Sequence, residues 1–175
     1  MTPAAPRILL MTGDGKGKTT AALGLVLRAV GHGQRAVVVR FLKNSQAVGE
    51  LAGLERLGVP VLGGGLGFVN RPGSQPFAEH VAAATAALAA AAELLAGGEF
   101  DVVVLDEVCT AVSLGLLTDE AVVAAISATR PEGVVALTGR GATPRLVELA
   151  DTVTDMVCVK HAYQQGVKSQ RGVER

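Results

Sequence analysis

A short segment near the amino terminus combines glycine, lysine and threonine in a spacing that suits the binding of an anion. It reads T-G-D-G-K-G-K-T-T from Thr12 to Thr20. Glycine at every second position from 13 to 17 lets successive backbone N–H groups turn inward around a negative charge. Lys18 adds a mobile positive charge, and the hydroxyl of Thr19 can bind Mg²⁺. These residues predict a site for phosphate groups together with a divalent cation.

The flanking residues give this segment the layout of a phosphate-binding P-loop. The apolar run from Ile8 to Met11 predicts a strand over residues 7–12, and the alanine- and leucine-rich residues 19–30 predict a helix. The N–H groups and the positive dipole end at the start of such a helix would point at the same anion. The strict P-loop pattern has glycine where this chain has Thr12. A glycine-rich turn without a ligand therefore stays open as an alternative.

Two acidic residues follow a second apolar run and predict the metal side of the same site. Val102–Leu105 is a four-residue apolar run, and Asp106 and Glu107 come directly after it. In open α/β sheets, ligands bind outside the carboxyl ends of the strands. One of the two carboxylates would hold Mg²⁺ opposite Thr19, directly or through water. The alternative is a strand that simply ends in charged residues.

Two arginines are weaker candidates for contacts with the nucleotide. Arg140 lies in the segment T-G-R-G at 138–141, where the flanking glycines make a turn that could direct a guanidinium at phosphate. Arg28 lies ten residues after Lys18 on the first predicted helix. A solvated charge is the alternative for both residues, and for Arg28 the spacing alone favours it.

Strand and helix patterns alternate along the whole chain and predict one α/β domain. Further strands are expected over 35–41, 59–62, 101–107, 133–138 and 152–159, and further helices over 48–57, 77–95, 118–130 and 143–150. Residues 63–76, rich in glycine and proline, predict a functional or mobile loop. Residues 160–175 form a polar tail, for which disorder is the default expectation. The order predicts a mainly parallel six-stranded sheet with helices on both faces.

Composition argues against several other classes of protein. The 175 residues carry 16 basic and 16 acidic side chains, and aromatic residues make up 3%, so we expect no nucleic-acid partner. Cys109 and Cys158 have no metal-binding spacing, which favours a reducing compartment. We see no signal peptide and no membrane span; residues 81–96 come nearest to one. These observations predict a cytoplasmic protein.

Together these segments resemble the P-loop family of ATP:corrinoid adenosyltransferases. The resemblance covers nearly the whole chain. Its most specific part is the tail, because other P-loop enzymes do not carry it. The matching stretches are T-G-D-G-K-G-K-T-T-A-A-L-G at 12–24 with Arg28 and G-H-G at 31–33, G-L-G-F at 65–68, V-V-L-D-E at 103–107, R-P at 130–131, L-T-G-R-G at 137–141, L-A-D-T-V-T-D-M at 149–156, V-K-H-A at 159–162 and G-V-K-S-Q-R-G-V-E at 166–174.

The resemblance implies a P-loop NTPase fold of the RecA-like kind and a specific reaction. The 5′-deoxyadenosyl group of ATP would pass to Co(I) of a reduced corrinoid, and inorganic triphosphate would leave. Asp106 and Glu107, with Thr19, match the metal region; Phe68 matches an aromatic residue that crowds the lower face of the corrin. The resemblance also implies a homodimer and a flavodoxin-type or flavin reductant. The residues that match the nucleotide site are Thr12, Gly13, Asp14, Gly15, Lys16, Gly17, Lys18, Thr19, Thr20 and Arg28, and those expected to act in catalysis are Lys18, Phe68 and Arg140.

The chain departs from the family pattern at several positions. The family loop G-x-G-F-T-W reads G-L-G-F-V-N here, so Asn70 replaces a tryptophan, and Cys109-Thr110 stands where the family tends to Asn-Tyr or Thr-Tyr. We also expect that this chain lacks the amino-terminal extension that can cover the corrin in some members. Two other functions therefore stay open: a P-loop phosphohydrolase or kinase in which Glu107 orients water, and a corrinoid-binding protein without catalysis.

Overall fold

The computed structural model describes residues 5–42, 49–67, 69, 72 and 75–173. Its centre is a six-stranded sheet with the order β3-β2-β4-β5-β1-β6, in which every pair of neighbours is parallel. The strand that carries Asp106 is thus separated from β1 by β5. The strands are β1 (Arg7–Thr12), β2 (Ala36–Arg40), β3 (Val61–Gly63), β4 (Val102–Asp106), β5 (Val134–Thr138) and β6 (Thr152–Asp155).

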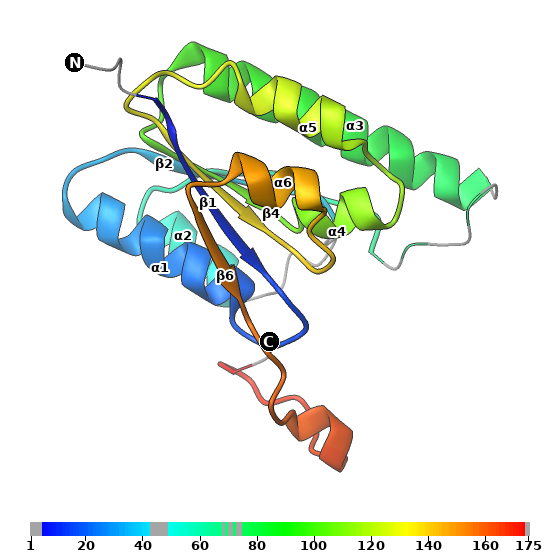
Figure 1. Ribbon diagram of the computed structural model, residues 1–175. Helices are drawn as coiled ribbons and strands as arrows, with labels where there is room; N and C mark the ends of the chain where they lie inside the picture. Colours follow the sequence, from blue (N-terminus) through cyan, green and yellow to red (C-terminus); the bar gives the residue numbers. More distant parts are fainter. Residues whose placement is uncertain (1–4, 43–48, 68, 70–71, 73–74, 174–175) are drawn as a thin grey trace.

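Helices cover both faces of the sheet (Figure 1), which confirms the predicted P-loop NTPase architecture. In Figure 1, α1 and α2 lie below the sheet and the other α-helices lie above it. A short 3₁₀-helix, η1 (Ala162–Gln165), lies in the carboxyl-terminal tail. The α-helices are α1 (Lys18–Gly31), α2 (Gly49–Arg56), α3 (Gln75–Gly97), α4 (Val108–Ser113), α5 (Asp119–Ile126) and α6 (Pro144–Leu149).

The central strands supply both cores because alternate side chains point to opposite faces. Val37 and Val39 of β2 belong to the core under α3 and α5, whereas Val38 belongs to the core over α1. The same alternation places Leu105 on the first face and Val104 on the second. A rigid central sheet therefore positions the loops that follow the carboxyl ends of its strands.

Helix α3 is long and apolar enough, by length and composition, to cross a membrane. Its buried side chains recur with the helical period and face the sheet, as expected for the apolar stripe of a core helix. They belong to the same core as β2 and β4. We therefore assign α3 to the core of the α/β fold. The buried apolar residues of this stripe are Ala84, Ala87, Leu88, Ala91 and Leu95.

Several predicted boundaries were wrong for local reasons. The helix predicted over 118–130 ends at Ile126, where the hydroxyls of Ser127 and Thr129 donate to the carbonyls of Val123 and Ile126. The strand predicted over 152–159 ends at Asp155, because its partner β1 ends at Thr12 in that register.

Two other differences concern short elements and helix starts. Helix α4 was not predicted, and η1 lies in a tail for which the sequence predicted no element. The predicted starts of α5 and α6 are confirmed, because Thr118 accepts the N–H of Ala121 and Thr143 accepts that of Leu146.

Candidate active site

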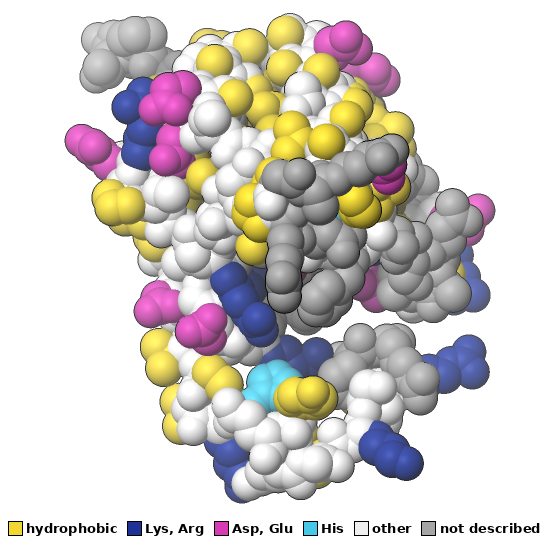
Figure 2. Space-filling model, turned by 90° about the vertical axis from the view of Figure 1, so that its right-hand side faces the viewer, with side chains coloured by type: hydrophobic (Ala, Val, Ile, Leu, Met, Phe, Trp, Pro, Cys, Tyr) yellow, Lys and Arg dark blue, Asp and Glu magenta, His cyan; other side chains and the backbone are white. Residues whose placement is uncertain are grey.

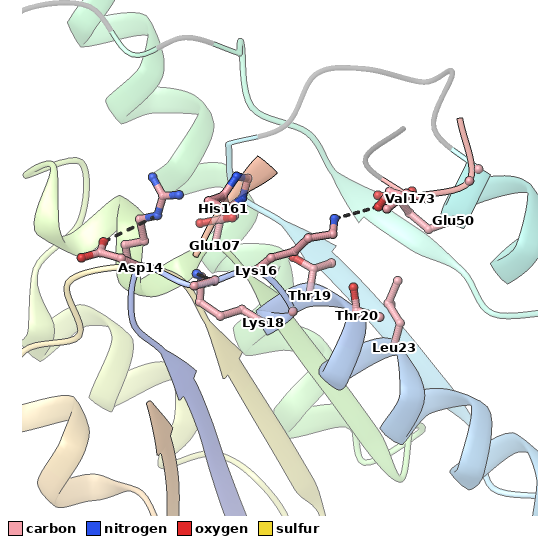
Figure 3. Close-up of a pocket in the computed structure, with 15 residues that line it drawn as sticks. Asp14, Lys16, Lys18, Thr19, Thr20, Leu23, Glu50, Glu107, His161 and Val173 are labelled. Atoms are coloured by element: carbon pink, nitrogen blue, oxygen red, sulfur yellow. Dashed lines mark hydrogen bonds and ion pairs between the residues drawn. The ribbon is translucent and has the colours of Figure 1, made fainter. Parts of the chain in front are cut away.

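The carboxyl edge of the sheet carries a cleft with a volume of about 490 Å³. Figure 3 shows Lys16 from the β1–α1 loop, Lys18 and Thr19 from the first turn of α1, and Glu107 and His161 among the side chains around this cleft. The segments that line it come from five places in the chain. The lining residues are Asp14, Gly15, Lys16, Gly17, Lys18, Thr19, Thr20, Leu23, Gly49, Glu50, Glu107, Arg140, His161, Gly172 and Val173.

The loop requires glycine for two different structural reasons. Gly13 and Gly17 have positive φ angles of 93° and 121°, a region that residues with a Cβ rarely adopt. Gly15 is buried against the end of β6: its N–H donates to the carbonyl of Met156 at 2.6 Å, and a Cβ at Gly15 would lie 2.5 Å from that oxygen. The loop therefore depends on β6 as well as on its own glycines.

Lys18 is the central cation of the cleft. Its Nζ donates to the carbonyl oxygens of Gly13 at 2.6 Å and Gly15 at 2.8 Å, and only 8% of the residue is exposed. Burial and then the Arg140 guanidinium lower the pKa of Lys18, against a smaller raising effect of Glu107. A bound anion would favour the charged ammonium, so this lysine is suited to meet phosphate.

Asp106 is the centre of a buried hydroxyl network. Its Oδ1 accepts hydrogen bonds from Thr19 on α1 and from Thr138 at the end of β5, each at 2.8 Å. Asp106 is only 2% exposed and Thr138 is fully buried. The network joins β4, β5 and the first turn of α1, and brings two of the three predicted metal residues into direct contact.

Glu107 stands apart because its backbone is strained. It is the one non-glycine residue with positive φ in the described part of the chain (φ 66°, ψ 20°), and such conformations often mark functional sites. Its N–H donates to the Thr138 hydroxyl at 2.9 Å, and its carboxylate accepts from the Thr110 hydroxyl at 2.5 Å. The carboxylate lines the cleft, next to the P-loop.

The donor set of these residues fits Mg²⁺. Thr19, Asp106 and Glu107 offer hydroxyl and carboxylate oxygens, the ligands that this ion prefers. Within the described ranges no three His, Cys, Asp or Glu side chains form a group that could hold a metal. Mg²⁺ does not need such a group of three side chains, since it is bound by one or two carboxylates together with phosphate and water.

The other predicted residues lie in different places. Thr12 accepts the N–H of Ala142 at 3.3 Å, and Arg140 approaches Asp14 with 3.8 Å between Nε and Oδ1, both side chains being exposed. Arg28 lies exposed in the last turn of α1 and is not among the described residues that line the cleft. Ten residues of helix separate it from Lys18, a rise of about 15 Å. Phe68 and Asn70 lie outside the described residues.

The tail returns to the P-loop and closes one side of the cleft. Nζ of Lys16 donates to the carbonyl of Val173 at 2.7 Å, across 157 positions of sequence. A second cavity of about 770 Å³ lies on the tail side and shares Asp14, Arg140, His161 and Val173 with the first. Figure 2 shows the hollow between the body and the tail, with basic side chains along its edges.

The structure adds residues that the sequence analysis did not single out as site residues. Thr138 and Thr110 hold the two acidic residues, and His161 lines both cavities. Thr138 had a usable signal, since it ends a buried strand at the same sheet edge as Asp106. Thr110 had none, because the N–H that orients its hydroxyl belongs to Arg140 on another loop.

Comparisons with known proteins agree with this geometry. The model of the family "ATP:corrinoid adenosyltransferase BtuR/CobO/CobP" matches residues 4–175. A corrinoid adenosyltransferase of Pseudomonas aeruginosa is 42% identical over 171 residues, covering 95% of this chain and 82% of the relative. The corrinoid adenosyltransferases of Salmonella typhimurium and Escherichia coli K12 are each 40% identical over 167 residues, covering 95% of this chain and 84% of each relative. The chain therefore belongs to the ATP:corrinoid adenosyltransferase family of enzymes.

Proposed function

We propose that the cleft binds Mg²⁺·ATP and that the chain, as one catalytic domain, transfers the adenosyl group of ATP to Co(I) of a reduced corrinoid. Membership of the family gives the reaction class. The observation that carries the proposal is that Lys18, the Thr19–Asp106 pair and Glu107 gather around one cleft. The full reaction forms a bond between cobalt and C5′ and breaks the bond between C5′ and oxygen. Triphosphate leaves with the electron pair.

The residues of the cleft suit a charged leaving group. The nucleophile is the cobalt of the substrate, so no protein base is needed. Backbone N–H groups of the P-loop, the Lys18 ammonium and the Arg140 guanidinium would stabilise the charge that develops on triphosphate. Thr19, Asp106 and Glu107 would hold Mg²⁺, which neutralises part of that charge. Lys18 would exchange the carbonyls of Gly13 and Gly15 for phosphate oxygens.

The corrinoid side of the proposal rests on the resemblance. Phe68 would crowd the lower face of the corrin and help to displace the lower ligand, so that Co(II) becomes reducible. A flavodoxin-type or flavin reductant, a homodimeric state and a cytoplasmic location belong to the same proposal. Asn70, in place of the family tryptophan, would alter this cobalt activation and leave the ATP site unchanged.

An anaerobic assay with ATP, Mg²⁺ and chemically reduced cob(I)alamin tests the proposal. We expect the absorbance change of Co–C bond formation, and inorganic triphosphate as the phosphate product. Release of ADP or monophosphate without corrinoid would instead identify a kinase or phosphohydrolase. Binding of the corrinoid without Co–C bond formation would identify a non-catalytic protein.

A further inference from the structure

Thr110, in the first half of α4, makes hydrogen bonds in two directions with one hydroxyl. Oγ1 donates to Oε2 of Glu107 at 2.5 Å and accepts the backbone N–H of Arg140 at 2.8 Å. A hydroxyl has one hydrogen and two lone pairs. Since the Arg140 N–H occupies a lone pair, the single hydrogen of Thr110 is free to point at Glu107. A hydroxyl bound to an ionised carboxylate makes one of the stronger hydrogen bonds in proteins.

Glu107 needs such a partner because its backbone conformation is unfavourable. Residues with a Cβ keep positive φ angles only where the surroundings enforce them. Here the Thr138 hydroxyl fixes the backbone N–H of Glu107, and Thr110 fixes its carboxylate. The side chain is therefore held at both ends while it lines the cleft.

The loop after β5 is built so that it can reach Thr110. Gly139 has φ 136°, and a Cβ there would lie 2.6 Å from the backbone nitrogen of Thr110 and 2.8 Å from its Oγ1. Only glycine allows this approach, and it brings the N–H of Arg140 onto the Thr110 hydroxyl. Thr110 itself is not among the described residues that line the cleft, so it acts through Glu107.

We propose that Thr110 is a positioning residue: its hydroxyl, oriented by the backbone N–H of Arg140, holds the Glu107 carboxylate where it serves Mg²⁺ in the nucleotide cleft. The inference rests on the proposed function for the presence of Mg²⁺·ATP. It concerns nucleotide binding alone, so it can be tested without a corrinoid.

The test compares Thr110→Val, which keeps the shape and removes the hydroxyl, with Thr110→Ser, which keeps the hydroxyl. Binding of a fluorescent ATP analogue is measured over a series of Mg²⁺ concentrations and in EDTA. We expect Thr110→Val to need at least fivefold more Mg²⁺ for half-maximal binding, with affinity in EDTA within twofold of the wild type. Thr110→Ser should stay within twofold in both conditions.

Ser113→Ala is the matched control, because the Ser113 hydroxyl lies on the same helix and donates to the carbonyl of Thr110. It should leave the Mg²⁺ dependence unchanged. If Thr110→Val does not fold, Thr110→Ala replaces it with the same expectation. An unchanged Mg²⁺ dependence without the hydroxyl, or equal losses with Mg²⁺ and in EDTA, would overturn the proposal.

A double-mutant cycle with Glu107→Gln separates this role from a general loss of structure. If Thr110 acts through Glu107, Thr110→Val should change the Mg²⁺ dependence by less than twofold in the Glu107→Gln background. Fully additive effects would contradict it. If the protein bound nucleotide as expected and yet failed to adenosylate a corrinoid, the proposed function would fail while the role of Thr110 stood.

Discussion

The two walls of the nucleotide cleft are built in different ways. The sheet wall, formed by Lys18, Thr19 and Glu107 with Asp106 behind Thr19, consists of side chains that are buried or half-buried. The tail wall, formed by His161, Gly172 and Val173, comes from a segment that is exposed along nearly all of its length. The first is attached to α1, β4 and β5 of the core, whereas the second returns to the P-loop through a side-chain hydrogen bond of Lys16.

This difference indicates that the two walls of the cleft have different roles. Under the proposed function, the groups that would meet triphosphate and Mg²⁺ must keep their geometry, and a rigid sheet edge provides it. A segment with few buried contacts opens at little cost in free energy. We infer that the sheet wall supplies most of the binding free energy and that the tail wall adjusts access to the cleft.

The largest effect is expected from Lys18→Ala, which removes the central cation of the sheet wall. Charge-assisted hydrogen bonds are worth about 1.5–3 kcal/mol each, so ATP affinity should fall by about 100-fold and transfer to the corrinoid should be lost. The melting temperature should not fall much, because the variant also removes a buried charge. Unchanged transfer at limiting ATP would refute the P-loop assignment.

The same lysine predicts a pH dependence of ATP binding. Its pKa is lowered by burial and by Arg140, and bound triphosphate would raise it again. At pH values between the pKa of Lys18 in the free protein and its pKa in the ATP complex, binding of ATP is accompanied by uptake of a proton on Lys18. The affinity for ATP should therefore decrease as pH rises towards 10.5. Titration calorimetry in buffers of different ionisation enthalpy would detect the proton uptake. Lys18→Arg should remove this decrease, since arginine stays charged.

Gly15→Ala should disturb the contact between the P-loop and the residues that follow β6. The new Cβ would lie 2.5 Å from the carbonyl oxygen of Met156 and 2.8 Å from that of Val157, both backbone atoms. Overpacking of this kind costs about 1–3 kcal/mol, which corresponds to a melting temperature roughly 3–10 °C lower. ATP affinity should fall about tenfold, because the P-loop must move.

Gly24→Ala is the matched control in the adjoining helix. Its Cβ would meet nothing within 4 Å in the middle of α1. The change should raise the free energy of unfolding by about 1 kcal/mol through helix propensity, with unchanged ATP binding. Equal melting temperatures for the two variants would mean that the loop does not rest on β6.

The P-loop was predictable from sequence because its function depends on neighbouring residues. Nine consecutive positions specify the loop, the helix start and the lysine. The parallel sheet with helices on both faces also followed from the alternation of strand and helix patterns, since parallel strands need crossover helices; the order of its strands was not predicted. Asp106 and Glu107 were predictable as a pair because two consecutive charged residues after an apolar run indicate the end of a buried strand.

The sequence analysis did not predict the bond between Thr138 and Asp106 or the bond between Arg140 and Thr110, because each joins residues far apart in the chain. Thr138 and Asp106 are 32 positions apart, and Arg140 and Thr110 are 30 apart. Helix α4 was missed because it is six residues long and begins after a residue with positive φ. Arg28 stays a prediction from the resemblance, because it is not among the described residues that line the cleft and the cleft therefore does not test its contact with the nucleotide.

Truncation after Gln170 should show that the end of the tail wall contributes little to ATP affinity. The deletion removes the carbonyl of Val173 that accepts from Lys16. An exposed hydrogen bond contributes about 0.5–1.5 kcal/mol, so ATP affinity should fall between about twofold and tenfold. The melting temperature should change by less than about 1 °C. A loss of about 100-fold, or a clear fall in stability, would make the tail a structural part of the site.

The smallest effect is expected for the two cysteines, because one lies behind the sheet wall and the other lies beside the tail. Cys109 is fully buried behind Glu107, and burial raises the pKa of its thiol to about 12. Cys158 is half-buried and lines the second cavity beside the tail. Because the thiolate is the reactive form, iodoacetamide at pH 8 should label Cys158 and leave Cys109 unlabelled until the protein unfolds, as peptide mass mapping would show.

Cys158→Ser should abolish labelling of the folded protein and change transfer by less than twofold. Labelling of Cys109 at a similar rate would mean that the sheet wall opens as readily as the tail, and the proposed division between the two would be wrong.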